Sequence, residues 1–138
     1  MTISEKLPSR IEIIPEFILR VIDKIRPPDL TAEEIFNIKL CLEEALINAM
    51  RHGNKLRPEA FVEVNIEATA DYLKIQIKDE GKGFDPGNLP DPTKNENLEK
   101  PGGRGVFLIK NLMDKVEYFD CGRGIRMVKF FRGKGGKK

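Results

Sequence analysis

Apolar residues occupy every second position in two neighbouring segments of the chain. The first segment is Phe61–Ala68 and the second is 73–77, with Ala70 and Asp71 between them. An alternation of period two is typical of a β-strand with one buried face, and so short a break predicts a hairpin. A sheet with one buried face needs a second layer to cover it.

Two segments with helical spacing of apolar residues precede the hairpin. The first runs over 14–25, up to the two prolines that follow. Its start is open, because Ser9 with Glu12 fits a capping box whereas Pro15 fits the first helical position. In the second, Thr31 with Glu34 forms a capping box, and Gly53 is a natural residue to follow the helix. Its buried stripe is expected to be Ile35, Ile38, Leu42, Ala45 and Ala49.

A long irregular segment separates the hairpin from the last elements. Residues 84–102 contain four Pro, two Gly and three Asn without apolar periodicity. Such a loop is typical of a functional lid, or else of a flexible insertion. Apolar spacing then predicts a helix over 106–113, beginning near Gly105, and strands over 116–119 and 125–131.

The order of these elements predicts the fold class. With a weakly alternating edge strand over 2–8, the order is β, α, α, β, β, loop, α, β, β. We expect an α/β (α+β) two-layer sandwich whose mixed, mainly antiparallel sheet carries its helices on one face. The length of 138 residues suits a single domain over 1–131, followed by a Gly/Lys tail over 132–138 that is expected to be disordered.

Charge and composition favour a cytoplasmic protein. The formal net charge of +2 comes from the tail, which holds four basic residues and no acid, so we expect no direct binding of nucleic acid. Cys41 and Cys121 form no CxxC motif, which predicts reduced thiols, and one histidine does not suffice for a zinc site. No apolar run approaches the ~18 residues of a membrane span, and no signal peptide is evident.

Several common active sites are excluded by missing motifs. The only serines are Ser4 and Ser9, and neither lies in a G-x-S-x-G elbow. The chain has no G-x-x-x-x-G-K-[ST] phosphate loop. The G-R-G at 103–105 continues as V-F-L, so it lacks the third glycine of a dinucleotide fingerprint.

The second helix carries a carboxylate and a carboxamide one turn apart. Glu44 and Asn48 stand at i and i+4, so both face the same space. An asparagine oxygen is a suitable ligand for Mg²⁺, and a nearby glutamate can orient or deprotonate a nucleophile. The alternative is a solvated polar face without chemistry.

Two glycine-rich segments add a possible ligand site. Asp79 ends a predicted strand, where its carboxylate can accept a hydrogen bond from an exocyclic amine. The glycines at 81 and 83 let the backbone pass close to a ligand. The G-G-R-G at 102–105 stands before a helix, where free N–H groups and Arg104 suit phosphate. The alternatives are a simple turn and a hinge.

These motifs resemble those of the GHKL ATPases, which share a histidine-kinase-like ATPase domain. EALINA at 44–49, with HG at 52–53, resembles their N box. DEGKGF at 79–84 resembles their first glycine box, and GRGVFLI at 103–109 their second. Over about 3–131 the chain is similar to the stand-alone anti-sigma-factor serine kinases of this superfamily.

The resemblance implies roles for single residues. Glu44 would be the general base or orienter of a hydroxyl, Asn48 would ligate Mg²⁺, and Asp79 would accept from the adenine amino group. His52 would either cap the helix or face the phosphates. Residues 84–102 would form a lid. The implied set of ATP-binding residues is Asn48, His52, Asp79, Gly81, Gly83, Gly103, Arg104, Gly105 and Val106.

The resemblance also implies partners. Such kinases use ATP and Mg²⁺ to phosphorylate a serine of an anti-anti-sigma protein, and they sequester a sigma factor, commonly as homodimers. The alternative function is a nucleotide-gated binding module that exchanges partners without phosphate transfer. A third interpretation, nucleic-acid binding, depends on the basic tail alone.

Overall fold

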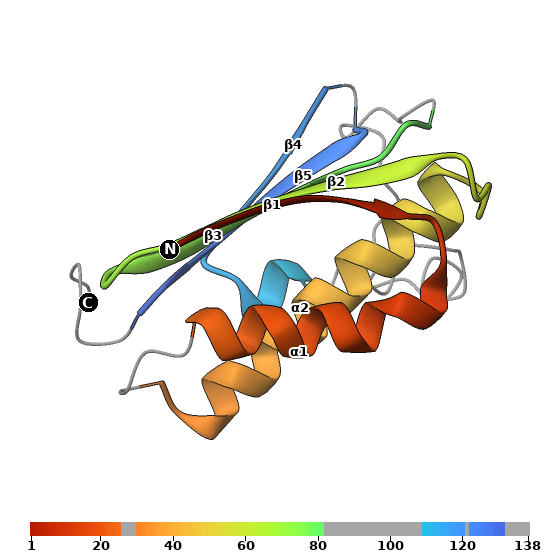
Figure 1. Cartoon of the computed structure of the whole chain (residues 1–138). Helices are drawn as coiled ribbons and strands as arrows, with labels where there is room; N and C mark the ends of the chain where they lie inside the picture. Colours follow the sequence, from red (N-terminus) through yellow and green to blue (C-terminus); the bar gives the residue numbers. More distant parts are fainter. Residues whose placement is uncertain (26–29, 82–108, 121, 132–138) are drawn as a thin grey trace, which may run out of the picture.

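The computed structural model describes residues 1–25, 30–81, 109–120 and 122–131. The expected lid at 84–102, the glycine-rich segment at 102–105 and the tail at 132–138 lie outside these ranges. The described chain forms two layers, a twisted sheet and a layer of helices on one of its faces (Figure 1). The predicted two-layer sandwich is therefore confirmed.

The five described strands pair only in antiparallel fashion. They are β1 (Thr2–Pro8), β2 (Phe61–Ala68), β3 (Tyr72–Lys78), β4 (Lys115–Phe119) and β5 (Gly124–Phe130), and their order in the sheet is β1-β2-β3-β5-β4. The mixed, mainly antiparallel sheet expected from the sequence is thus antiparallel throughout this part of the chain. The chain leaves β3, crosses to the edge strand β4 and returns as β5 beside β3.

The predicted hairpin is formed by β2 and β3. Ile66 pairs with Ile75 and Val64 with Ile77, so the apolar positions of the two strands share the buried face. The hydroxyl of Thr69 accepts the backbone N–H groups of Asp71 and Tyr72. This local turn fixes the register on which the buried face depends.

Helices α1 (Ile14–Ile25) and α2 (Ala32–Ile47) cover one face of the sheet (Figure 1). The capping box of α2 is present, since Glu34 N–H donates to Thr31 Oγ1 over 3.0 Å and Thr31 N–H donates to Glu34 Oε1 over 2.9 Å. Residues 109–112 form a further helical turn, with Ile109 buried. The start predicted near Gly105 lies outside the described residues.

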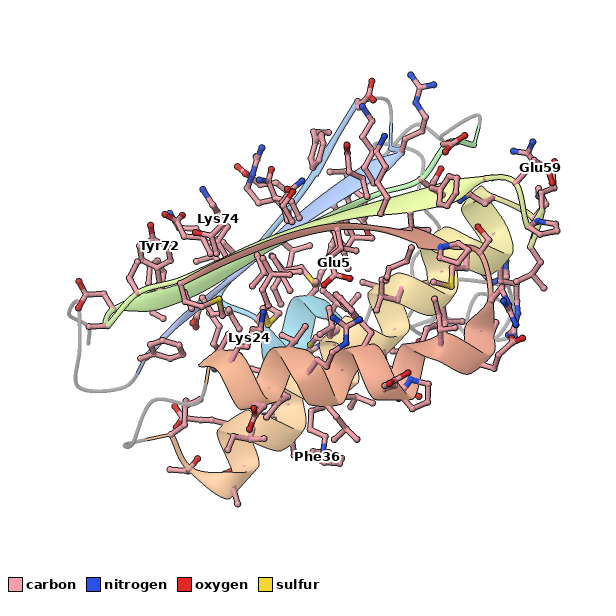
Figure 2. All side chains as sticks on the ribbon, viewed as in Figure 1. Glu5, Lys24, Phe36, Glu59, Tyr72 and Lys74 are labelled. Atoms are coloured by element: carbon pink, nitrogen blue, oxygen red, sulfur yellow. The ribbon has the colours of Figure 1, made fainter. Side chains whose placement is uncertain are left out.

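The core lies between the two layers, and the other face of the sheet is polar. Fully buried side chains include Phe17 of α1, Leu42 of α2 and Ile75 of β3. Lys74 and Tyr72 project from the opposite face of β3 (Figure 2). No helix among the described residues is long and apolar enough to span a bilayer.

The structure resolves the open start of the first helix and corrects the expected end of the second. Ser9 does not cap α1: a 3-10 turn (Ile11–Ile13) precedes the helix, and Pro15 lies in the first helical turn. Gly53 does not end the second helix in a left-handed conformation, because its φ is not positive. The helix continues instead as a π-helical turn (Asn48–Gly53), here called the π-turn, and the left-handed residues are Lys55 and Leu56.

Candidate functional site

Glu44 and Asn48 lie one α-helical turn apart near the C-terminal end of α2. The backbone N–H of Asn48 donates to the carbonyl oxygen of Glu44, so the i, i+4 relation is kept up to this point. Both residues are half-buried, whereas Glu43 is exposed. The structure therefore brings the predicted carboxylate and carboxamide to one partly enclosed face of the helix.

His52 does not continue this row at the same spacing. It lies in the π-turn, whose wider backbone hydrogen bonding runs from Asn54 N–H to Ala49 O over 2.8 Å. Burial lowers the pKa of His52, and the charges of Arg51 and Lys55 lower it further. The imidazole therefore resists protonation, which disfavours the charged helix cap considered from the sequence.

Asp79 follows β3 directly and packs against the π-turn. A Cβ on Gly53 would overlap the Asp79 carboxylate, and a Cβ on Gly81 would overlap the Gly53 carbonyl oxygen. At Gly81 the obstacle is the backbone of Gly53, so glycine is required there. At Gly53 it is the side chain of Asp79, which a larger residue would displace. Gly81 thus has a structural reason besides the approach to a ligand that the sequence suggested.

The distance between Asp79 and Glu44 sets the length of the candidate site. Gly53 contacts Asp79, and Glu44 stands nine positions earlier, roughly 13 Å along a helix axis at 1.5 Å per residue. His52 adjoins Gly53 and so lies at the Asp79 end. A ligand bridging Asp79 and Glu44 would have to be elongated, which favours a nucleotide over a compact metabolite.

The carboxylate of Asp79 is partly satisfied within its own turn. Oδ1 accepts the Gly81 N–H over 2.7 Å, and within the described ranges no donor is hydrogen-bonded to Oδ2. Burial raises the pKa of Asp79, opposed by the Gly81 hydrogen bond and by the charge of Arg123. A half-buried acceptor oxygen with a raised pKa is typical of a ligand site.

The raised pKa of Asp79 predicts a pH-dependent effect of Asp79→Asn on stability. A carboxyl whose pKa is higher in the folded chain stabilises the fold below its unfolded pKa, and this contribution is lost as the pH rises through the folded value. At pH 7 the ionised Asp79 therefore lowers the free energy of unfolding. Thermal unfolding should show the Asp79→Asn variant to be at least as stable as the wild type at pH 7, with its relative advantage shrinking towards pH 4.

Asp120→Asn is the matched control for this titration. The hydrogen bond from Lys78 holds the pKa of Asp120 below its ordinary value, so the sign is reversed and this carboxylate stabilises the fold at neutral pH. Its replacement should change the pH dependence in the opposite sense. Equal pH profiles for the two variants would contradict the assignment of Asp79 as a desolvated group.

The remaining predicted site residues cannot be placed. Gly83, Gly103, Arg104, Gly105 and Val106 lie outside the described residues. In the part of the chain that is described, no cluster of three or more His, Cys, Asp or Glu side chains could hold a metal by itself. A metal here would need ligands from its own substrate, as Mg²⁺ bound to phosphates does.

Sequence reasoning missed two residues that build this site. Gly53 was interpreted as a helix terminator and as part of the N-box resemblance, but not as the residue whose missing side chain makes room for Asp79. Asn54 was not singled out from the sequence, and it is 0% exposed. The G-N pair after a histidine carries no local signal of burial, because the burial comes from β2 and from the turn after β3.

Comparison with known proteins identifies the family of the chain. The family model of the histidine kinase-like ATPase domain matches residues 7–129. A serine-protein kinase RsbW of Staphylococcus epidermidis is 30% identical over 138 residues, which cover 94% of this chain and 87% of that protein. A serine-protein kinase RsbW of Staphylococcus aureus (strain MSSA476) is 34% identical over 110 residues, covering 74% and 69%.

Proposed function

Because the chain belongs to the histidine kinase-like ATPase domain family, we propose that it is an ATP-dependent protein-serine kinase. The observation that carries the proposal is the half-buried Glu44, one helical turn before Asn48 and on the helix that also contacts Asp79. The similar proteins named serine-protein kinase support it.

ATP would bind with its adenine at Asp79 and its phosphates towards Glu44. Oδ2 of Asp79 is the acceptor left for the adenine amino group, since Oδ1 accepts from Gly81. Gly81 and Gly83 would border the base. Residues 103–105 and Val106 would hold the phosphates beneath a lid over 84–102, as the family resemblance implies. His52 would lie nearer the base than the phosphates.

Mg²⁺ would be held by Asn48 together with phosphate oxygens and water. The side chain offers a neutral oxygen on the face shared with Glu44, and Mg²⁺ commonly takes only one or two protein ligands when phosphates supply the others. The bound ion would neutralise charge on the phosphates. The donor set fits, because a lone asparagine beside a phosphate site suits Mg²⁺ better than a softer metal.

Glu44 would act on the hydroxyl of the incoming serine. As the serine oxygen forms its bond to the γ-phosphorus, the bond from that phosphorus to the β,γ-bridging oxygen breaks and ADP leaves. The serine proton passes to the Glu44 carboxylate, which releases it to solvent afterwards. Phosphate transfer of this kind depends mainly on positioning and charge neutralisation.

The proposed substrate is a serine of an anti-anti-sigma protein, and the proposed second partner is a sigma factor. Both follow from the family resemblance, as do a homodimer and a cytoplasmic location. We propose a single domain over 1–131, with the tail at 132–138 outside it. Direct contact with nucleic acid or with a membrane is not part of the proposed activity.

Intact-mass spectrometry of the substrate protein tests the proposal. A co-encoded anti-anti-sigma candidate incubated with this chain and MgATP should gain the mass of one phosphate, and ADP in place of ATP should give none. A nucleotide-dependent complex without any mass gain would favour the second candidate, a binding module that exchanges partners without phosphate transfer.

Gly53→Ala should weaken both the fold and ATP binding. The added methyl group overlaps the Asp79 carboxylate, and overpacking of this kind costs about 1–3 kcal/mol of unfolding free energy. The displaced carboxylate should weaken ATP binding by about tenfold or more, since a hydrogen bond to a charged group contributes about 1.5–3 kcal/mol. Chemical denaturation and calorimetric titration with MgATP measure the two effects.

Gly124→Ala provides the control for overpacking. Its methyl group would overlap the Phe119 ring on the polar face of the sheet, so it should lower stability while leaving ATP affinity near the wild-type value. If both variants weaken ATP binding equally, the contact between Gly53 and Asp79 does not serve the nucleotide.

A further inference from the structure

Asn54 is a fully buried polar side chain beside the candidate site. It follows the π-turn directly and is 0% exposed. The C-terminal end of the helix layer reaches the end of the sheet where β2 begins (Figure 1). A buried amide must satisfy its hydrogen bonds within the protein, so its partners reveal what it holds in place.

Every donor of the Asn54 amide is used. Nδ2 donates to Ser9 Oγ over 2.9 Å and to the Phe61 carbonyl oxygen over 3.1 Å. Oδ1 accepts the backbone N–H of Glu80 over 2.7 Å. The side chain therefore joins the end of β1, the start of β2 and the turn that carries Asp79.

The partners of Asn54 agree on which way its amide faces. Its hydroxyl has one hydrogen, which it donates to the Ala60 carbonyl oxygen over 2.7 Å. Towards Asn54 it can therefore only accept, as the Phe61 carbonyl does, whereas the Glu80 N–H can only donate. Nδ2 must therefore face Ser9 and Phe61, and Oδ1 must face Glu80. Ser9 is 3% exposed, and water does not compete for this arrangement.

The turn after β3 is held from two sides by these contacts. Asn54 accepts from the Glu80 backbone, and the Glu80 carboxylate in turn accepts the Phe61 N–H over 2.8 Å. Asp79 itself packs on Gly53, the residue before Asn54. The extra residue accommodated by the π-turn brings Gly53 and Asn54 together against residues 79–81.

We propose that Asn54, held by Ser9 and Phe61, is a positioning residue that sets the selectivity for adenine by fixing the turn from which Asp79 accepts the hydrogen bond of the amino group. This inference deepens the proposed ATP site and rests on it. Guanine carries a carbonyl oxygen where adenine has its amino group. A correctly placed Asp79 therefore accepts a hydrogen bond from the amino group of ATP and repels the carbonyl oxygen of GTP.

The test compares the affinities for ATP and GTP across variants. Asn54→Ala removes the acceptor of the Glu80 N–H, and the ratio of the GTP to the ATP dissociation constant should fall at least tenfold. Ser9→Ala leaves the bond to Glu80 possible but removes one of the two acceptors that hold the amide. Ser9→Ala should therefore lower the ratio of the GTP to the ATP dissociation constant less than Asn54→Ala does. If the Asn54→Ala variant does not fold, Ser9→Ala still tests the proposal.

A core variant separates positioning from stability. Val62→Ala truncates a fully buried side chain of β2 and should lower the thermal midpoint while leaving the ratio unchanged. Amide hydrogen exchange should show loss of protection at Glu80 in Asn54→Ala but not in Val62→Ala, measured relative to global unfolding.

The outcomes distinguish this inference from the proposed function. A wild-type chain that binds MgATP without discriminating against GTP contradicts adenine recognition by Asp79, and the positioning role with it. A wild-type chain that prefers ATP, together with Asn54→Ala and Ser9→Ala variants that keep the same ratio as Val62→Ala, overturns the positioning role alone.

Discussion

Glu44→Gln is expected to slow phosphate transfer to the substrate serine by about 10²–10⁴-fold, the usual contribution of a positioned general base. Glutamine has nearly the same shape but cannot accept the proton of the serine hydroxyl. Because Glu44 lies one turn from Asn48 and far from Asp79 along the helix, ATP affinity should change by less than about threefold. Single-turnover transfer and equilibrium ATP titration measure the two quantities.

Glu43→Gln is the matched control. It makes the same chemical change one position earlier, on a side chain that is exposed, and it should retain transfer at nearly the wild-type rate. Equal rates for the two variants would contradict the assignment of Glu44 as the base. Loss of ATP binding in Glu44→Gln would instead give Glu44 a role in holding the nucleotide.

Asp79→Asn should weaken ATP binding by about 10²-fold, because a hydrogen bond to a charged group contributes about 1.5–3 kcal/mol. Asparagine can keep the bond from Gly81 N–H through its own Oδ1, so the turn survives. The atom at the Oδ2 position then becomes an NH₂ donor facing the adenine amino group, and two donors cannot pair. Calorimetric titration with MgATP gives the affinity.

The thermal stability of Asp79→Asn shows whether weaker ATP binding comes merely from a less stable fold. Because burial raises the pKa of Asp79, the neutral asparagine should not lower the thermal midpoint at pH 7. Weak binding by a chain that unfolds earlier than the wild type would mean that Asp79 supports the fold. ATP affinity equal to that of the wild type would remove Asp79 from the binding site.

Local sequence signals predicted the fold where the partner of a group lies nearby in the chain. Thr31 and Glu34 form the capping box expected of them, because each accepts a backbone N–H three residues away. Ser9 and Glu12 have the same spacing, yet no box forms. The Ser9 hydroxyl is instead paired with Ala60 and Asn54, which lie 51 and 45 residues away.

The sequence suggested which chemical groups form the candidate site, but it did not suggest how they pack together. Asp79 and the Glu44–Asn48 pair carry recognisable groups at recognisable spacings, so the sequence led to the prediction of a nucleotide site. The π-turn and the burial of Asn54 depend on contacts between α2, β2 and the turn after β3. No short pattern encodes contacts that form only once the layers have packed.

A crystal structure of the chain with a non-hydrolysable ATP analogue and Mg²⁺ tests the central claim most directly. We expect the adenine amino nitrogen within about 3 Å of Asp79 Oδ2, a hydrogen-bonding distance. Asn48 Oδ1 should ligate the Mg²⁺ ion, and Glu44 should face the γ-phosphate. An adenine bound away from Asp79, or a triphosphate directed away from α2, would contradict the account.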